Sequence, residues 1–303
     1  MLVFVTSDKG GTGRSVTSGN LAYRRALSGD DVCYLDFDFG SPTATGVFDI
    51  PAADATYGGL HSYVQGRTSS PRGIDVWTAS DRRGLCPPTA VRGRLVLFPG
   101  DVGGGEFALT APAMDNCIDL LLRLEEEFDV CFVDCSAGRS YALDMMLTAT
   151  ADPRLDGICS RWLVFHRWTR QHITAASGLV FGPRGVLQSG AARGHDPESL
   201  RNSIRFVRTA VPSADAFGFG ELRPSQVAWQ RRCDDQLRDM AVRHHLGPSV
   251  VLGTIPFEPM LQWREQLITD ADVALSHVAN PETVGAFDDL AQRLSDEMAW
   301  EGL

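Results

Sequence analysis

Seven consecutive residues near the start of the chain have the composition of a loop that binds phosphate: Lys9-Gly10-Gly11-Thr12-Gly13-Arg14-Ser15. The glycines let backbone N–H groups turn inward toward phosphate oxygens, and a helix beginning near Arg14 would present its positive N-terminus to the same anion. The hydroxyl of Ser15 stands where such a loop contacts Mg²⁺. The chemistry predicted here is the binding of a nucleotide through its phosphates.

Two acidic motifs follow apolar segments farther along the chain. Asp36-Phe37-Asp38 lies at the end of an expected strand, and we expect its two carboxylates to point differently. One of them can brace the loop while the other faces the phosphates. Asp134 ends a second expected strand at the carboxyl edge, where ligands bind in open α/β sheets. This is the Walker B position, whose aspartate holds Mg²⁺ through water.

The basic residues of the chain single out one position of the glycine-rich loop. Of 28 lysines and arginines, Lys9 is the only lysine. A position chosen without regard to function would hold that lysine in roughly one of 28 cases, so we infer that position 9 needs a compact ammonium and not a planar guanidinium.

Apolar runs alternate with amphipathic stretches, which predicts an α/β fold with a mainly parallel twisted sheet flanked by helices on both faces. The expected strands are 2–6, 31–36, 95–98, 130–134, 161–166, 204–207 and 249–255. The expected helices are 15–27, 59–65, 112–128, 141–150, 169–181, 225–245 and 281–298. Residues 182–197 are rich in glycine and proline and are expected to form a surface loop. Without a clear linker or internal repeat, residues 1–303 are predicted to be a single domain.

Composition and charge bear on which partners and which cellular compartment the protein can have. The net charge of −10 argues against broad coating of nucleic acid or anionic membrane. The first residues lack a signal-peptide core, and no apolar run reaches about 18 residues, so we expect no membrane span. Scattered cysteines without a C-x-x-C pair indicate reduced thiols in a cytoplasmic protein and no zinc site: they are Cys33, Cys86, Cys117, Cys131, Cys135, Cys159 and Cys233.

The ordered motifs resemble those of the ParA/MinD class of P-loop ATPases, whose glycine-rich loop is a deviant Walker A motif. Residues 35–40 resemble the second aspartate motif of this family, 133–138 its Walker B motif and 252–257 its G-x-I-P segment. The resemblance spans nearly the whole chain and is weakest at 46–94 and 182–202. It implies a three-layer P-loop NTPase-like sandwich that binds ATP and Mg²⁺ between the subunits of a homodimer.

The resemblance also implies roles for particular residues. Lys9 would reach the phosphates across the dimer and Asp38 would orient the attacking water, which makes these two the expected catalytic residues. Ser15, Asp38 and Asp134 would hold Mg²⁺. The expected nucleotide contacts are Gly10, Gly11, Thr12, Gly13, Arg14, Ser15 and Val16, with Pro256 and Phe257 against the adenine.

Arg14 departs from the family pattern, which has a lysine that cradles the β- and γ-phosphates. Arginine keeps the charge but is bulkier and planar. A coding bias toward arginine and a loss of hydrolysis would each explain the exchange. Three functions stay open: a dimeric ATP switch with slow or impaired hydrolysis, a non-hydrolysing nucleotide-binding scaffold or regulatory protein, and a pseudo-ATPase that keeps only the fold.

The base and the partner are less well specified. No asparagine follows residues 206–209, where family members often carry one, so adenine specificity stays open. Two arginine groups, 201/205/208 and 161/167/170, are candidate DNA contacts, although ordinary surface roles are favoured and the net charge gives DNA no support. The acidic segment 294–301 argues against binding to anionic membranes. A further protein partner is expected but not identified.

Overall fold

The strands form a single sheet in the computed structural model, which describes residues 1–51, 58–82, 84–85, 92–212 and 223–301. Within these ranges eight strands follow the order β3-β4-β2-β5-β1-β6-β7-β8. Every neighbouring pair is parallel except β3 with β4. The strands are β1 Leu2–Thr6, β2 Val32–Phe37, β3 Ile74–Asp75, β4 Leu95–Phe98, β5 Val130–Cys135, β6 Ser160–Arg167, β7 Ile204–Val211 and β8 Val251–Pro256.

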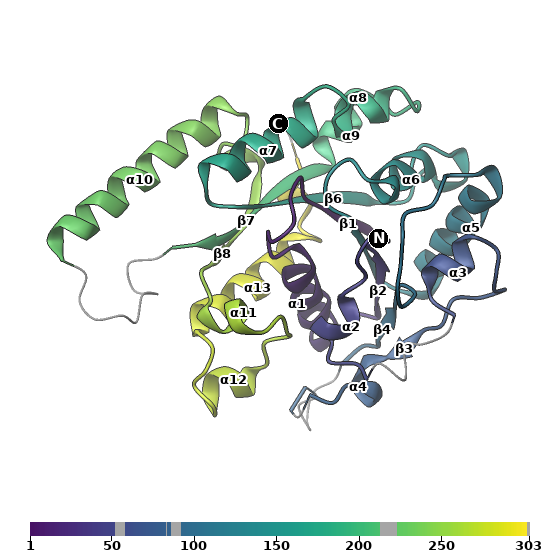
Figure 1. Ribbon diagram of the computed structural model, residues 1–303, viewed down its shortest axis with the longest axis horizontal. Coiled ribbons are helices and arrows are strands. Elements are labelled where there is room, and N and C mark those ends of the chain that lie inside the picture. The colour runs from purple at the N-terminus through teal and green to yellow at the C-terminus, as the bar shows by residue number, and fades with distance from the viewer. Residues whose placement is uncertain (52–57, 83, 86–91, 213–222, 302–303) are drawn as a thin grey trace.

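Helices cover both faces of the sheet (Figure 1). One face carries α1 and α13, and the other carries α5, α6 and α7. The longer helices are α1 Arg14–Leu27, α5 Ala111–Glu127, α6 Tyr141–Ala149, α7 Arg170–Phe181, α10 Pro224–Arg243 and α13 Pro281–Arg293. The shorter ones are α2 Ala44–Val47, α3 Leu60–Val64, α4 Val76–Ala79, α8 Val186–Ala191, α9 Pro197–Asn202, α11 Pro259–Trp263 and α12 Asp270–Ala274.

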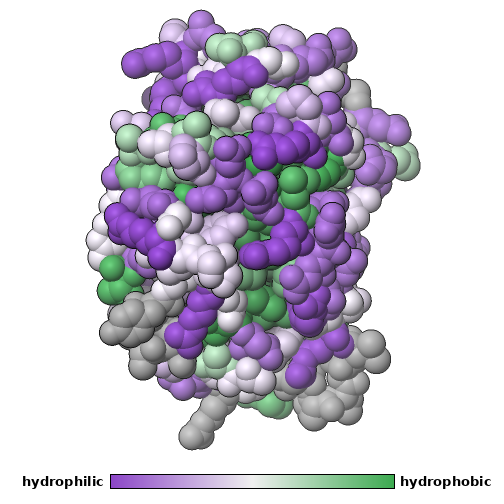
Figure 2. Space-filling model, turned by 90° about the vertical axis from the view of Figure 1, so that its right-hand side faces the viewer, coloured by the Kyte–Doolittle hydropathy of each residue, from purple (hydrophilic) through white to green (hydrophobic). Residues whose placement is uncertain are grey.

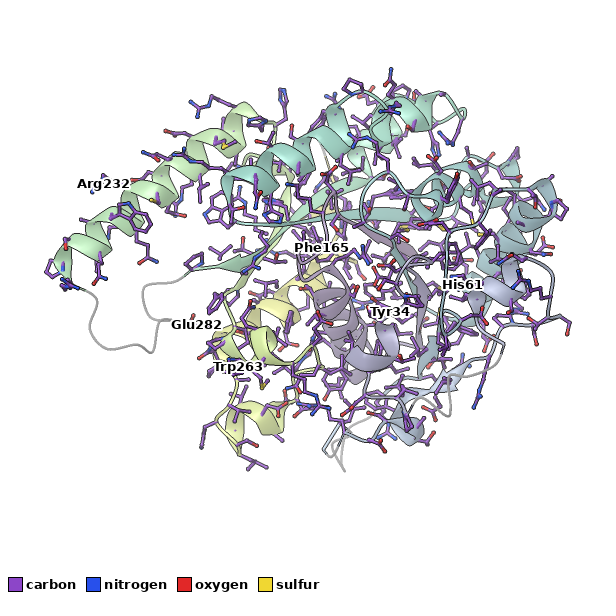
Figure 3. All side chains as sticks on the ribbon, in the orientation of Figure 1. Tyr34, His61, Phe165, Arg232, Trp263 and Glu282 are labelled. Carbon is purple, nitrogen blue, oxygen red and sulfur yellow. The ribbon has the colours of Figure 1, made fainter. Side chains whose placement is uncertain are left out.

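The apolar strands explain why helices cover both faces. Along β1, Leu2 and Phe4 enter the cluster beneath α5 and α6, whereas Val3 and Val5 enter the cluster beneath α1. All four side chains are fully buried. A strand apolar at every position needs cover on both sides, which parallel strands receive from the helices that connect them. Tyr34 and Phe165 lie in this interior, whereas Trp263 lies on the outside and is 91% exposed (Figure 3).

The predicted sheet and its helical layers are confirmed, but several details of the prediction are wrong. Residues 182–197 are not a loop throughout, because α8 lies within them and buries Val186. Gly190 of α8 lets that helix approach Leu200, since an added Cβ would lie 2.3 Å from the Leu200 side chain. The last helix ends at Arg293 instead of 298, and β7 continues to Val211.

Figure 2 shows one side of the surface, on which hydrophilic side chains predominate. The helix α10 projects from the opposite side of the molecule (Figure 1). Among the residues that the structure describes, no helix is both long and apolar enough to cross a membrane. The cysteines among them are all free thiols, and Cys86 lies outside the described residues.

Candidate functional site

The glycine-rich loop connects β1 to α1 at the carboxyl edge of the sheet. Gly11 and Gly13 have φ angles of 70° and 75°, the left-handed conformation that glycine adopts without a steric penalty. Gly13 is the N-cap of α1, no side chain caps this helix, and its first turn has no acidic residue. The first N–H groups of α1 therefore have no side-chain acceptor, which is the arrangement that binds anions at helix N-termini.

A cavity of about 250 Å³ opens beside this loop. The expected nucleotide contacts among its lining residues are Gly11, Thr12, Gly13, Val16 and Pro256. The other expected contacts, Gly10, Arg14, Ser15 and Phe257, are not in the lining, and Phe257 donates its backbone N–H to the carbonyl of Val211. The structure thus brings the loop and the end of β8 to one cavity, as the two distant motifs predict.

Several cavity residues are not predicted by the motifs. Arg167, the last residue of β6, lines the cavity, and so do Glu258 and Glu265. Ala210 lies in the same wall with a φ angle of 50°, which is uncommon for a residue with a Cβ atom. Its neighbour Thr209 donates a hydrogen bond to the carbonyl of Thr12 and so ties β7 to the glycine-rich loop.

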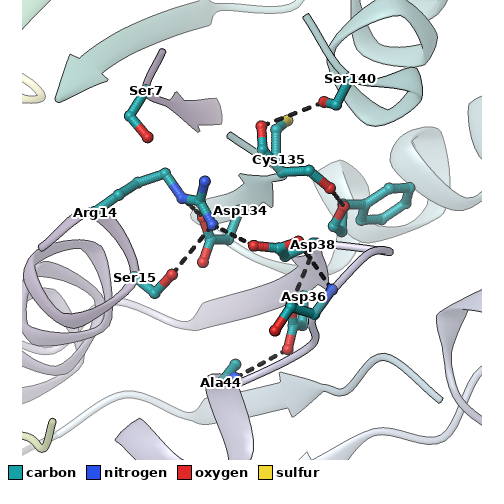
Figure 4. Close-up of polar contacts among 12 residues, drawn as sticks. Ser7, Arg14, Ser15, Asp36, Asp38, Ala44, Asp134, Cys135 and Ser140 are labelled. Carbon is teal, nitrogen blue, oxygen red and sulfur yellow. Dashed lines mark hydrogen bonds and ion pairs between the residues drawn. The ribbon is translucent and has the colours of Figure 1, made fainter. Parts of the chain in front are cut away.

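Arg14 lies among all three residues expected to hold Mg²⁺ (Figure 4). Its Nε is 2.5 Å from Oδ1 of Asp134, and its Nη2 is 2.8 Å from Oδ2 of Asp38. Nη2 also donates to Oγ of Ser15 at 3.3 Å. The side chain of Arg14 is 7% exposed and that of Asp134 is 1% exposed, so this cluster is largely withdrawn from water.

The second oxygen of Asp134 has its own buried donor. Tyr34 of β2 donates its hydroxyl to Oδ2 at 2.9 Å, and Oγ of Ser18 lies 2.8 Å from the same hydroxyl. Burial, reinforced by the charge of Asp134, raises the pKa of Tyr34 well above its ordinary value, so the phenol stays a donor. Burial also raises the pKa of Asp134, and the adjacent guanidinium of Arg14 opposes that rise.

Asp36 holds the chain that follows β2. Its two oxygens accept the backbone N–H groups of Asp38 at 3.2 Å and Ala44 at 2.9 Å. Burial, with a further contribution from Asp134, raises the pKa of Asp36 to about 8. The two carboxylates of this motif point differently, as expected, because β2 ends at Phe37 and Asp38 lies beyond it, whereas residues two apart within a strand share a face. Asp36 braces residues 38–44 instead of the phosphate loop.

Lys9 lies at the surface and contacts α7 instead of this buried cluster. Its Nζ is 3.5 Å from Oε1 of Gln171 in α7, and the Ser7 hydroxyl donates to its carbonyl at 3.0 Å. Lys9 is exposed and is not part of the cavity wall. Its expected role across a dimer stays a prediction, because a single subunit does not test it.

The oxygens expected to bind Mg²⁺ are engaged by a guanidinium. Carboxylate and hydroxyl oxygens suit this ion, which needs near-octahedral coordination at about 2.0–2.1 Å. Those of Ser15, Asp38 and Asp134 instead face Arg14, and in the described part of the chain no three His, Cys, Asp or Glu side chains form a group that could hold a metal ion. In this arrangement the residues do not fit Mg²⁺, which would have to displace Arg14. Their metal-binding roles stay predictions.

The arginine groups considered for DNA are mostly used in packing. Arg205 is 1% exposed, and its guanidinium donates to the backbone carbonyls of Asn202, Ile204 and Ala299. Arg161 and Arg205 both lie over the ring of Trp300, at 4.4 and 5.1 Å from its centroid. These two arginines therefore hold the C-terminal turn against the sheet and do not form an open basic surface.

Known proteins share this architecture. No protein-family model matches the chain. The septum site-determining protein MinD of Bacillus subtilis is 28% identical over 136 residues, which are 45% of this chain and 45% of MinD, so the match covers less than half of that relative. A chain of the MinC:MinD cell division protein complex of Aquifex aeolicus has a TM-score of 0.62 at 15% identity, covering 97% of this chain and 95% of its own.

MinD of Pyrococcus horikoshii, complexed with Mg-ADP, gives a TM-score of 0.54 at 15% identity and covers 98% of both chains. Likenesses at this level of identity show the fold. The chain has the fold of the MinD/ParA P-loop ATPases, which confirms the resemblance indicated by its motifs.

Proposed function

We propose that this chain, which has the fold of the MinD/ParA ATPases, is a nucleotide switch that binds ATP and dimerises around it, with slow or impaired hydrolysis. The observation that carries the proposal is the meeting of three features at one edge of the sheet. These are the left-handed glycines of the loop, the N-terminus of α1 without a side-chain cap, and the cavity of about 250 Å³ beside both. Together they offer backbone N–H groups to phosphates and space for the rest of a nucleotide.

Within this proposal the phosphates lie on the loop and the base lies toward Pro256, which lines the same cavity. The backbone N–H groups of the loop and the charges of Arg14 and Lys9 position the phosphates electrostatically. Lys9 acts across the dimer interface, which its exposed position on the loop permits. Asp38 would position the attacking water only when its carboxylate is released from Arg14.

A non-hydrolysing nucleotide-binding scaffold or regulatory protein is the second proposal. The 2.8 Å contact between Arg14 and Asp38 favours it, because a carboxylate held by a guanidinium is less able to orient water. A pseudo-ATPase that binds no nucleotide is the third. The second and third differ in ligand binding, and the first and second differ only in phosphate release.

Calorimetric titration with ATP and MgCl₂ separates these proposals. Saturable heat with one nucleotide per chain supports the first two, whereas no heat at about millimolar ATP leaves only the pseudo-ATPase. A phosphate-release assay then distinguishes the switch from the scaffold.

Dimerisation is tested by light scattering with and without ATP. The substitution Lys9→Ala should abolish the ATP-dependent dimer, and Arg232→Ala, which removes an exposed charge on α10 (Figure 3), should leave it intact. A Lys9→Ala protein that dimerises as well as the wild type would refute the proposed role of Lys9.

Other features follow from the same resemblance and are proposed with it. We propose that residues 1–303 form a single nucleotide-binding domain in the cytoplasm, and that a further protein partner reads the state of the dimer. A complex of MinC with MinD among the structures of this fold supports a search for such a partner. The resemblance implies that Mg²⁺ binds together with the nucleotide. Arg14 would have to leave the expected metal-binding oxygens before the ion could bind there.

A further inference from the structure

The guanidinium of Arg14 lies among the three side chains that the resemblance assigns to Mg²⁺. Building on the proposed nucleotide site, we propose that Arg14 replaces Mg²⁺, so that this chain binds nucleoside di- or triphosphates without a metal ion. The ligand class is thus the metal-free polyphosphate.

The first support is the identity of the partners of Arg14. Its Nε and Nη2 contact Asp134, Asp38 and Ser15, the three side chains whose oxygens would otherwise surround a metal ion. The guanidinium approaches the acidic pair from the side of the phosphate loop, because it extends from the first residue of α1 (Figure 4). A cation therefore already lies between the loop and the carboxylates.

The second support is the Nη1 group of Arg14, a hydrogen-bond donor that remains available for a ligand. A guanidinium has five N–H donors in a planar fork, and those on Nε and Nη2 face the cluster. Nη1 makes no hydrogen bond or ion pair with any residue that the structure describes, and Figure 4 shows it pointing away from Asp38 and Asp134. A phosphate oxygen can accept from Nη1, so Arg14 can bridge carboxylates and phosphate as a metal ion does.

The third support is the charge balance of the buried cluster. The guanidinium of Arg14 is a permanent cation and pairs with the carboxylates of Asp38 and Asp134, and Arg14 and Asp134 are both nearly buried. Removal of Arg14 from its place would leave Asp134 buried without a counter-ion, and a metal ion entering beside Arg14 would meet a like charge.

The metal dependence of nucleotide binding tests the proposal directly. For the wild type, the Kd for ATP in EDTA should lie within about threefold of its value in MgCl₂, whereas for Arg14→Lys it should weaken by about tenfold or more in EDTA. Stoichiometric Mn²⁺ binding by wild type with ATP, followed by electron paramagnetic resonance, would overturn the proposal. So would a wild-type affinity that falls tenfold in EDTA.

A second measurement needs no nucleotide and so separates this proposal from the proposed function. Arg14→Met should be destabilised, and millimolar MgCl₂ should recover several degrees of its melting temperature by binding the released carboxylates, on the order expected for a ligand of the folded state. Arg24→Met is the matched control, because Arg24 lies on the same helix, is 5% exposed and pairs with Asp270 at 2.6 Å. Its melting temperature and that of the wild type should not respond to MgCl₂.

The outcomes of the two measurements distinguish failure of this proposal from failure of the proposed function. Rescue of Arg14→Met by MgCl₂ without any ATP binding by the wild type would refute the proposed function and retain the cation role of Arg14. ATP binding by the wild type without rescue of Arg14→Met by MgCl₂ would retain the proposed function and refute the cation role of Arg14. If Arg14→Met does not fold, metal binding by Arg14→Lys in the Mn²⁺ assay decides, and its absence overturns the proposal.

Discussion

The Nε atom of Arg14 lies 2.5 Å from Oδ1 of Asp134, with both side chains nearly buried. The resemblance assigns Arg14 to the place of the P-loop lysine and Asp134 to the Walker B position, and residues of two motifs more than a hundred residues apart form one ion pair. An arginine at position 14 thus engages the acid to which the resemblance assigns the metal, so it bears on the proposed metal site as well as on the phosphates.

Hydrolysis should be limited by this ion pair. We expect Arg14→Lys to increase phosphate release from ATP in MgCl₂ by about tenfold or more, because a compact ammonium would free Asp38 and Asp134 for metal and water. A coupled phosphate assay measures the change. Arg24→Lys on the same helix serves as the control and should have the wild-type rate. An unchanged rate in Arg14→Lys would mean that another feature limits hydrolysis.

Tyr34 should contribute to stability through its bond to Asp134. Tyr34→Phe removes a hydroxyl that donates to Oδ2 at 2.9 Å and leaves a buried carboxylate oxygen without this partner. We expect a loss of about 1–3 kcal/mol in the free energy of unfolding, measured by urea denaturation. Tyr141→Phe is the matched control, since Tyr141 is 49% exposed and its loss should stay within about 0.5 kcal/mol. Equal effects of the two substitutions would contradict the assigned role of Tyr34.

Asp36 should make stability depend on pH. Its pKa is about 8 in the folded protein against an ordinary value of 3.8, so the folded state binds more protons between these values. The contribution of Asp36 is therefore complete below about pH 4 and is lost as pH rises to about 8, by up to about 1.4 kcal/mol per pH unit. Asp36→Asn should abolish this slope in the free energy of unfolding.

The comparison of slopes, and not of absolute stabilities, tests the role of Asp36, because asparagine also alters the hydrogen bonds to Asp38 and Ala44. Asp235→Asn, at an exposed position of α10, should retain the wild-type slope. A wild-type slope in Asp36→Asn would show that other groups cause the pH dependence.

Gly13 should be intolerant of a side chain for conformational reasons. Its φ of 75° costs an alanine roughly 1–2 kcal/mol, although an added Cβ would meet only ordinary contacts. We expect Gly13→Ala to lower stability by that amount in urea denaturation and to weaken ATP binding. Gly285→Ala, inside α13 with open space around its Cβ, should be neutral or stabilise by about 0.5–1 kcal/mol. A stable Gly13→Ala protein with unchanged affinity would exclude a strict requirement for glycine.

The sequence predicts most of the sheet because its strands are buried on both faces. A continuous apolar run such as 2–6 can be recognised as a strand without knowledge of the strand that it pairs with. The two-residue strand β3 has no such signal, since Ile74 and Asp75 become a strand only through antiparallel pairing with β4. The helix α8 also depends on tertiary contact, where the lack of a side chain at Gly190 admits Leu200.

The motifs place the site residues but not their side-chain contacts. Tyr34 precedes Asp134 by 100 residues and reaches it because β2 pairs with β5. Its position two residues before Asp36, on the same face of β2, was a usable signal. The place of Arg167 in the site is predictable in a similar way, since this residue ends the strand beside β1. The pose of Arg14 follows from packing among three distant segments, which a linear motif does not encode.

The exposed ammonium of Lys9 has a practical consequence, because it is the only lysine side chain in the sequence. Amine-reactive dyes and cross-linkers can modify one side-chain position, and that position is on the glycine-rich loop. A fluorophore coupled there would report loop rearrangement without mutagenesis, and acylation would remove the charge of Lys9 while leaving every arginine intact.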